Sequence, residues 1–166
     1  MKREEQIRQK LEEAVDILKR LGMPSAQQNE RTAYCLLALL NITPEKEWKN
    51  AEKPLVGITP MMTFAKEYYN KDYAPNTRET FRRFSTHQMI QAGIVLYNPD
   101  KPERAVNSPN AVYQISDAAL LVIKAYKTKK FDSLLYDFIK NKPTLSAQYA
   151  HEREMKMVSV KIKKKS

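Results

Sequence analysis

Glycine, cysteine and histidine are scarce in this sequence of 166 residues, which has 3 Gly, 1 Cys and 2 His. So few glycines argue against the Gly-rich phosphate loops of nucleotide-binding folds. A single cysteine and two histidines also exclude a disulfide framework and a structural zinc site. The thiol of Cys35 lies within the apolar run Ala33–Leu40, which favours a buried, inert side chain over a nucleophile.

Long apolar segments are missing as well. No stretch approaches the roughly 18 apolar residues of a membrane span, and the first ten residues lack the apolar core of a signal peptide. A soluble intracellular protein with no membrane partner is therefore expected. Its length and ordinary globular composition, with 42% hydrophobic and 29% charged residues, predict one compact domain.

Positive charge is abundant, with a formal net charge of +10. A polyanionic partner is favoured, because cations that displace the counterions of a nucleic acid gain binding free energy. Residues 1–75 are nearly balanced, and the excess lies in Asn76–Gln91 and from Lys124 onward. For Lys124–Lys142 a solvated helix face competes with phosphate contact.

Helical spacing of apolar residues and capping signals predict most of the elements. An amphipathic helix is expected at 3–21, ending near Gly22. Ser25 and Gln28 form a capping-box pattern before a buried helix through Leu40, and Thr43-Pro44-Glu45 resembles another helix start.

Two further helices follow, separated by a turn. One begins at Thr59-Pro60, the turn covers Asn70–Asn76, and the next helix covers Thr77–Ala92, with Asn76 and Glu79 as a capping-box pair. This pair predicts a helix-turn-helix with a long turn.

The pattern then alternates, which predicts a β-hairpin of 94–97 and 111–115. Helices are expected at 116–126, 131–139 and 145–156, and a strand at 157–162. The sequence thus predicts a mainly α fold with a small β-hairpin, a winged helix with additional N- and C-terminal helices. Its domain is expected at 1–157, with 158–166 starting a linker or strand that leads elsewhere.

The helix at 77–92 carries the most informative residues. Phe81, Phe84 and Ala92 fall on one side and are expected to be buried. On the opposite side, i, i+3, i+4, i+7 spacing predicts one exposed ridge of base-reading candidates: Glu79, Arg82, Arg83 and Thr86. Arginine can donate two hydrogen bonds to guanine O6 and N7, and glutamate can accept one from cytosine N4. The alternative is a solvated face in which Glu79 serves the helix cap and pairs with Arg83.

Backbone-positioning candidates flank this ridge. Asn76, Thr77 and Arg78 stand where a helix N-terminus can hold a phosphate. In the hairpin loop, Lys101, Arg104 and Asn107 could rest on the DNA backbone. Acidic neighbours cancel the local charge there, so a passive turn remains an equal alternative.

Only one nuclease-like pattern occurs, Pro99-Asp100 with Glu154-Met155-Lys156. A PD…ExK site needs its acids on adjacent strands to hold a hard cation. Asp100 is expected in a loop and Glu154 in a helix, so we reject this pattern and expect no catalytic or metal-binding residue in the chain.

Three segments carry a resemblance to a known family: MPSAQQNERTAYCLLALLNITPEKEW, YAPNTRETFRRFSTHQMIQAGIVLYNPDKPERAVNSPNAVYQI and YAHEREM. They resemble the N-terminal domain of type II restriction endonucleases of the BsuBI/PstI type. The resemblance implies double-stranded DNA as partner, a prokaryotic cytoplasmic location and a palindromic site, CTGCAG in the name-giving enzymes. It also implies that cleavage belongs to a longer parent with a Mg²⁺-dependent PD-(D/E)xK domain, which this chain lacks, and that the parent can be a homodimer. This chain itself is expected to need no cofactor.

Two other functions remain open at this point. A stand-alone winged-helix transcription regulator would share the same DNA-reading surface. A protein-interaction module would instead use its basic face on an acidic partner and would not bind DNA even at low salt.

Overall fold

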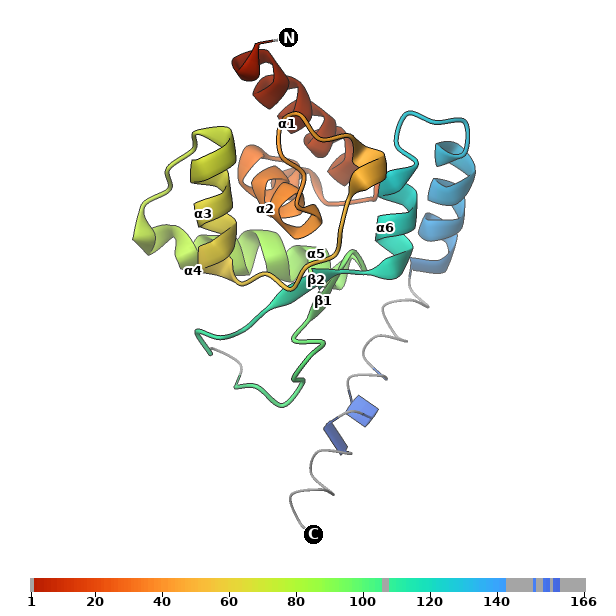
Figure 1. Ribbon diagram of the computed structural model, residues 1–166. Coiled ribbons are helices and arrows are strands. Elements are labelled where there is room, and N and C mark those ends of the chain that lie inside the picture. The colour runs from red at the N-terminus through yellow and green to blue at the C-terminus, as the bar shows by residue number, and fades with distance from the viewer. Residues whose placement is uncertain (1, 106–107, 143–150, 152–153, 156, 159–166) are drawn as a thin grey trace.

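The computed structural model describes residues 2–105, 108–142, 151, 154, 155, 157 and 158. Helices cluster around a central one, and a β-hairpin projects from one side of the body (Figure 1). In chain order the elements are α1 (Arg3–Arg20), η1 (Ser25–Gln27), α2 (Glu30–Leu40), η2 (Trp48–Asn50), α3 (Ile58–Tyr69), η3 (Pro75–Thr77), α4 (Arg78–Phe81), η4 (Arg82–Thr86), α5 (His87–Gln91), β1 (Val95–Tyr97), β2 (Tyr113–Ile115) and α6 (Asp117–Lys124). Residues 131–142 form a further helix.

Helix α2 is the centre of the core, since every residue from Thr32 to Leu40 is buried. It begins at a cap other than the one predicted. The Asn29 side chain accepts a hydrogen bond from the Thr32 amide at 2.9 Å, whereas Ser25 opens only the short 3-10 turn η1. Both residues are good caps, and the helix starts at the one that the apolar segment follows directly.

The predicted helix start at Thr43-Pro44-Glu45 is wrong. These residues form a turn in which the Thr43 hydroxyl donates to the Glu45 carboxylate at 2.6 Å. The hydrogen bond is local, as expected for a Ser or Thr that competes with helix formation. The chain then passes through η2, where Trp48 is buried and donates to Glu13 of α1 at 3.1 Å.

A helix-turn-helix follows, as predicted. Helix α3 ends at Asn70, whose φ of 57° is left-handed. The next helix is continuous over residues 78–91 but consists of α4, the π-helical segment η4 and α5; we call it the composite helix. Phe81 anchors it, because its fully buried ring packs edge-on against Tyr73 in the turn, with 4.9 Å between ring centroids.

The π-helical segment changes which side chains of the composite helix face the core. Its i→i+5 hydrogen bonds place an extra residue in the turn, so later residues lag behind the α-helical spacing. Phe81 and Ala92 are buried as predicted, but Phe84 is 43% exposed and the expectation that it is buried is wrong. Ser85 takes the inward position and bonds to α2: Arg31 Nε donates to its hydroxyl at 2.9 Å, and the Thr32 hydroxyl lies 2.8 Å from it.

The hairpin completes a winged helix. Strands β1 and β2 pair antiparallel with Val95 opposite Ile115. Val56, just before α3, forms a β-bridge with Tyr113 through two backbone hydrogen bonds of 2.9 Å. The order of helix, β-bridge residue, two helices and hairpin confirms the predicted fold class, and the loop at 98–112 is the wing.

The base of the wing is held by side chains. Asn98 is fully buried in a left-handed conformation with φ 48°. Its Oδ1 accepts hydrogen bonds from the Val112 amide and from Arg104, both at 2.9 Å. Arg104 also binds both carboxylate oxygens of Asp100, at 3.2 and 3.1 Å. The two ends of the wing are therefore tied to each other.

The remaining helices flank the winged helix. Ser116 caps α6 by accepting from the Ala119 amide at 3.2 Å, and Lys142 at the end of helix 131–142 donates to the Leu21 carbonyl at 3.1 Å. Residues 151, 154, 155, 157 and 158 are helical, so the strand predicted from Met157 is wrong at its first two positions. Most of the predicted helix 145–156 and of the segment 158–166 lies outside the described residues.

Candidate nucleic-acid interface

Two predicted base-reading residues form an ion pair on the outer surface of the composite helix. Arg82 donates through Nε to Glu79 at 3.0 Å and through Nη2 to the other carboxylate oxygen. Glu79 is the more exposed partner, with 64% of its side chain accessible against 33% for Arg82. These hydrogen bonds lower the pKa of Glu79 and raise that of Arg82. Both groups are therefore charged at neutral pH.

The predicted exposed ridge is shorter than expected. Arg83 is exposed, and its guanidinium lies 5.3 Å from the ring centroid of Phe84. Thr86 is fully buried, and its hydroxyl donates to the Arg82 carbonyl at 3.0 Å. The expectation that Thr86 lies on the ridge is wrong, because η4 turns this position toward the core. In this conformation Thr86 has no access to a base edge.

The N-terminal end of the composite helix is open to solvent. Asn76 and Arg78 are exposed. The Thr77 hydroxyl donates to the Ala74 carbonyl at 2.6 Å and gives no side-chain cap. The predicted capping box of Asn76 with Glu79 is not formed, because Thr77 is the N-cap residue and Glu79 binds Arg82. The first amides of the helix therefore receive no hydrogen bond from the Thr77 side chain.

The two cationic side chains of the wing, Lys101 and Arg104, differ in exposure. Lys101 is exposed. Only 15% of the Arg104 side chain is accessible, and its hydrogen bonds to Asp100 and Asn98 hold the loop together. Its bonds also lower the pKa of Asp100. Asn107 lies outside the described residues.

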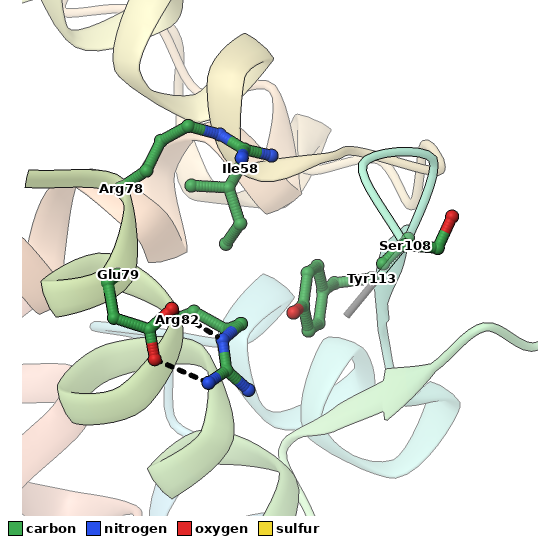
Figure 2. Close-up of a pocket in the computed structure, with 7 residues that line it drawn as sticks. Ile58, Arg78, Glu79, Arg82, Ser108 and Tyr113 are labelled. Atoms are coloured by element: carbon green, nitrogen blue, oxygen red, sulfur yellow. Dashed lines mark hydrogen bonds and ion pairs between the residues drawn. The ribbon is translucent and has the colours of Figure 1, made fainter. Parts of the chain in front are cut away.

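A small cleft separates the composite helix from the wing. Figure 2 shows Arg78, Glu79 and Arg82 on the helix side, Ser108 and Tyr113 on the hairpin side and Ile58 of α3 beside them. The lining is Ile58, Arg78, Glu79, Arg82, Ser108, Ala111 and Tyr113. Arg78 and the Ser108 hydroxyl add a cation and a donor to the Glu79–Arg82 ion pair, which leaves the opening suited to an anion.

Sequence reasoning missed the π-helical segment, and with it the roles of two residues. Ser85 was not considered, although it joins the composite helix to α2, and Phe84 was assigned to the core. No motif for a π turn is recognisable in the sequence. At regular α-helical spacing Phe84 and Ser85, at i+3 and i+4, both lie on the side of Phe81, so spacing alone does not indicate that Ser85 is buried and Phe84 exposed.

The two acids of the rejected nuclease pattern lie in different kinds of structure. Asp100 lies in the wing paired to Arg104, and Glu154 is in a helical stretch. In the described part of the chain, no three His, Cys, Asp or Glu side chains gather in a way that could hold a metal ion. None of the helices described there has the length and apolar character of a membrane span.

Comparisons with known proteins agree on one family. The model of the BsuBI/PstI restriction endonuclease HTH domain matches residues 8–147. The chain is similar to the type II restriction enzyme BsuBI of Bacillus subtilis, with 56% identity over 152 residues, 92% of this chain and 48% of that protein. It is also similar to the type II restriction enzyme AplI of Arthrospira platensis (strain NIES-39 / UTEX 3086 / IAM M-135), with 35% identity over 90% of this chain and 46% of that protein.

A solved structure gives the same result at the level of the fold. The SdaI restriction endonuclease superposes with a TM-score of 0.76 at 32% identity, over 84% of this chain and 44% of that chain. The chain thus spans about half the length of the relatives it matches. It belongs to the BsuBI/PstI restriction endonuclease family and corresponds to the helix-turn-helix domain of that family.

Proposed function

We propose that this chain recognises a specific sequence in double-stranded DNA as the N-terminal half of a type II restriction endonuclease. The observation that carries the proposal is the Glu79–Arg82 pair, beside Arg83, on the exposed side of the composite helix. A helix of this width fits the major groove, where each base pair presents a distinct pattern of donors and acceptors. The family match disfavours a stand-alone regulator.

Arg82 is the proposed reader of guanine. Glu79 binds its Nε and one hydrogen of Nη2, which leaves donors at the far end of the guanidinium, on Nη1 and Nη2. Those donors match O6 and N7 of guanine. Glu79 then acts as a positioning residue, because it holds the long arginine side chain in one orientation before DNA arrives and so reduces the entropy lost on binding. Arg83 is proposed as a second base reader beside Arg82.

Other residues are proposed to hold the DNA backbone. Asn76, Thr77 and Arg78 lie at the helix N-terminus, where the helix dipole favours a phosphate. Lys101 of the wing is free to reach a phosphate farther along, whereas Arg104 supports the wing from within. The cleft between helix and wing is the proposed seat of one phosphate, since Arg78 and the Ser108 hydroxyl line it.

The direct test is equilibrium binding to a duplex that contains CTGCAG and to a scrambled duplex of equal length. Fluorescence anisotropy should show tighter binding to the preferred site. Both affinities should fall with salt, with a log–log slope of about −0.9 for each phosphate neutralised. Selection from a randomised duplex pool would find the site if it differs from CTGCAG. Absence of binding to any duplex at low salt would contradict the proposal and favour a protein partner.

We further propose that the chain binds without cutting. Purified protein incubated with Mg²⁺ and plasmid DNA is expected to give no specific fragments, because cleavage is assigned to the second half of a longer, Mg²⁺-dependent parent that can act as a homodimer. The control is the Asp100→Asn/Glu154→Gln variant, which should behave identically. Specific cleavage that this variant abolishes would revive the rejected metal site.

A further inference from the structure

Phe84 is an exposed apolar ring next to Arg83 on the composite helix. Among the described residues 78–91 it is the one large apolar side chain that is exposed, at 43%, while Phe81 one turn earlier is fully buried. Regular α-helical spacing would place Phe84 on the buried side, so its exposure is a result of η4. A π segment that turns an apolar side chain outward favours a functional use of that side chain.

The neighbours of Phe84 hold it beside the ridge. Arg83 stacks over the ring at 5.3 Å from its centroid. The next residue, Ser85, is fully buried and bonded to Arg31 of α2, so the backbone directly after Phe84 cannot rotate freely. The ring therefore lies next to Arg83, the second base-reading candidate.

The major groove offers one apolar group that such a ring can contact. Thymine carries a C5-methyl group there, whereas the other bases present hydrogen-bonding groups or bare C–H edges. We infer that Phe84 contacts the C5-methyl of a thymine in the recognition site and so discriminates thymine. This inference rests on the proposed DNA recognition and adds to it a residue that reads by apolar contact.

The test removes the methyl group from the DNA and the ring from the protein. Dissociation constants are measured for the wild type and Phe84→Ala on the preferred duplex and on the same duplex with uracil in place of thymine. Burial of one methyl-sized group corresponds to about a fourfold change in affinity. The wild type should lose about fourfold per methyl on the uracil duplex. Phe84→Ala should already bind the thymine duplex more weakly and lose nothing further on uracil.

Two additional variants sharpen the result. Phe84→Leu retains an apolar side chain and should still discriminate thymine from uracil. Tyr136→Ala removes another aromatic ring, 67% exposed on helix 131–142, and should leave the discrimination as in the wild type. Circular dichroism confirms that each variant is folded.

The possible failures can be told apart. If wild type and Phe84→Ala lose the same factor on uracil, or if neither loses affinity while both prefer the site over scrambled duplex, Phe84 does not contact a thymine methyl and DNA recognition still stands. If the wild type shows no preference among duplexes, the proposed function and this inference both fail.

Discussion

Arg82→Ala is expected to lower affinity for the preferred duplex by about 1–3 kcal/mol and to relax the choice of base at one position. The reason is that an arginine that donates twice to guanine loses both bonds when the base changes. Affinity for scrambled duplex should change much less. Measuring each variant on both duplexes at matched salt separates loss of base reading from loss of general attraction.

Removal of Arg82 also leaves the Glu79 carboxylate without its partner, and the repulsion between this carboxylate and DNA lowers affinity further. The double variant Glu79→Ala/Arg82→Ala removes that repulsion and shows the loss due to the guanidinium itself. Lys101→Ala is the matched control, since a phosphate looks the same beside every base pair and its loss should weaken all duplexes alike. Equal losses of Arg82→Ala on both duplexes would contradict base reading. No loss of affinity on either duplex would mean that the ridge does not contact DNA, and residues 27–31 would become the next candidates for the recognition surface.

Glu79→Gln tests how the pair works. As a positioning residue, Glu79 should affect the same base as Arg82, because the amide still accepts one hydrogen bond but loses the charge that orders the guanidinium. A residue that reads cytosine directly would affect a different base pair. The hydrogen bonds from Arg82 lower the pKa of Glu79, so the carboxylate stays ionised at neutral pH and into its ordinary titration range. Site preference should therefore be constant between pH 6 and 8.

Phe81→Ala should reduce the free energy of unfolding by about 3–5 kcal/mol, the usual cost of removing a fully buried aromatic ring. Phe81 has no exposed surface and packs against Tyr73 at 4.9 Å. Truncation would leave a cavity under the composite helix. Urea denaturation followed by circular dichroism gives the midpoint and slope.

Phe84→Ala is the paired control for this measurement, because it deletes the same ring three residues later on the exposed side. Its effect should stay below about 1 kcal/mol. Similar losses for the two variants would contradict the π-helical register of residues 82–86. Reversed losses would place Phe84 in the core and Phe81 outside it, which would contradict the structure at both positions.

The sequence predicted the order of elements well because apolar periodicity is strong where a helix has one buried side. It therefore located α1, α3, the hairpin and the extent of the composite helix. Capping patterns were less reliable. Ser25 and Asn29 are both suitable caps within five residues, and the choice between them depends on how α2 packs, which local sequence does not contain.

The candidate site was predicted in part for a related reason. Glu79, Arg82 and Arg83 lie before or within the first part of η4, so regular spacing still predicts their solvent-accessible positions. Phe84 and Thr86 follow the change in hydrogen bonding, and their predicted exposures are reversed. That change depends on tertiary contacts such as the bond of Ser85 with Arg31 of α2, across 54 positions of sequence.

The buried Asn98 and its partner Arg104 give the wing a property that matters when DNA arrives. A free loop loses about 1–2 kcal/mol of conformational entropy for each residue whose backbone becomes fixed. Here the loop ends are already fastened, through the Val112 amide on one side and Asp100 on the other. Part of this ordering cost is met when the protein folds, so a contact from Lys101 adds to affinity with less entropy to offset it. Loosening the fastening with Asn98→Gly would therefore make association entropically less favourable without removing a single atom that faces the DNA.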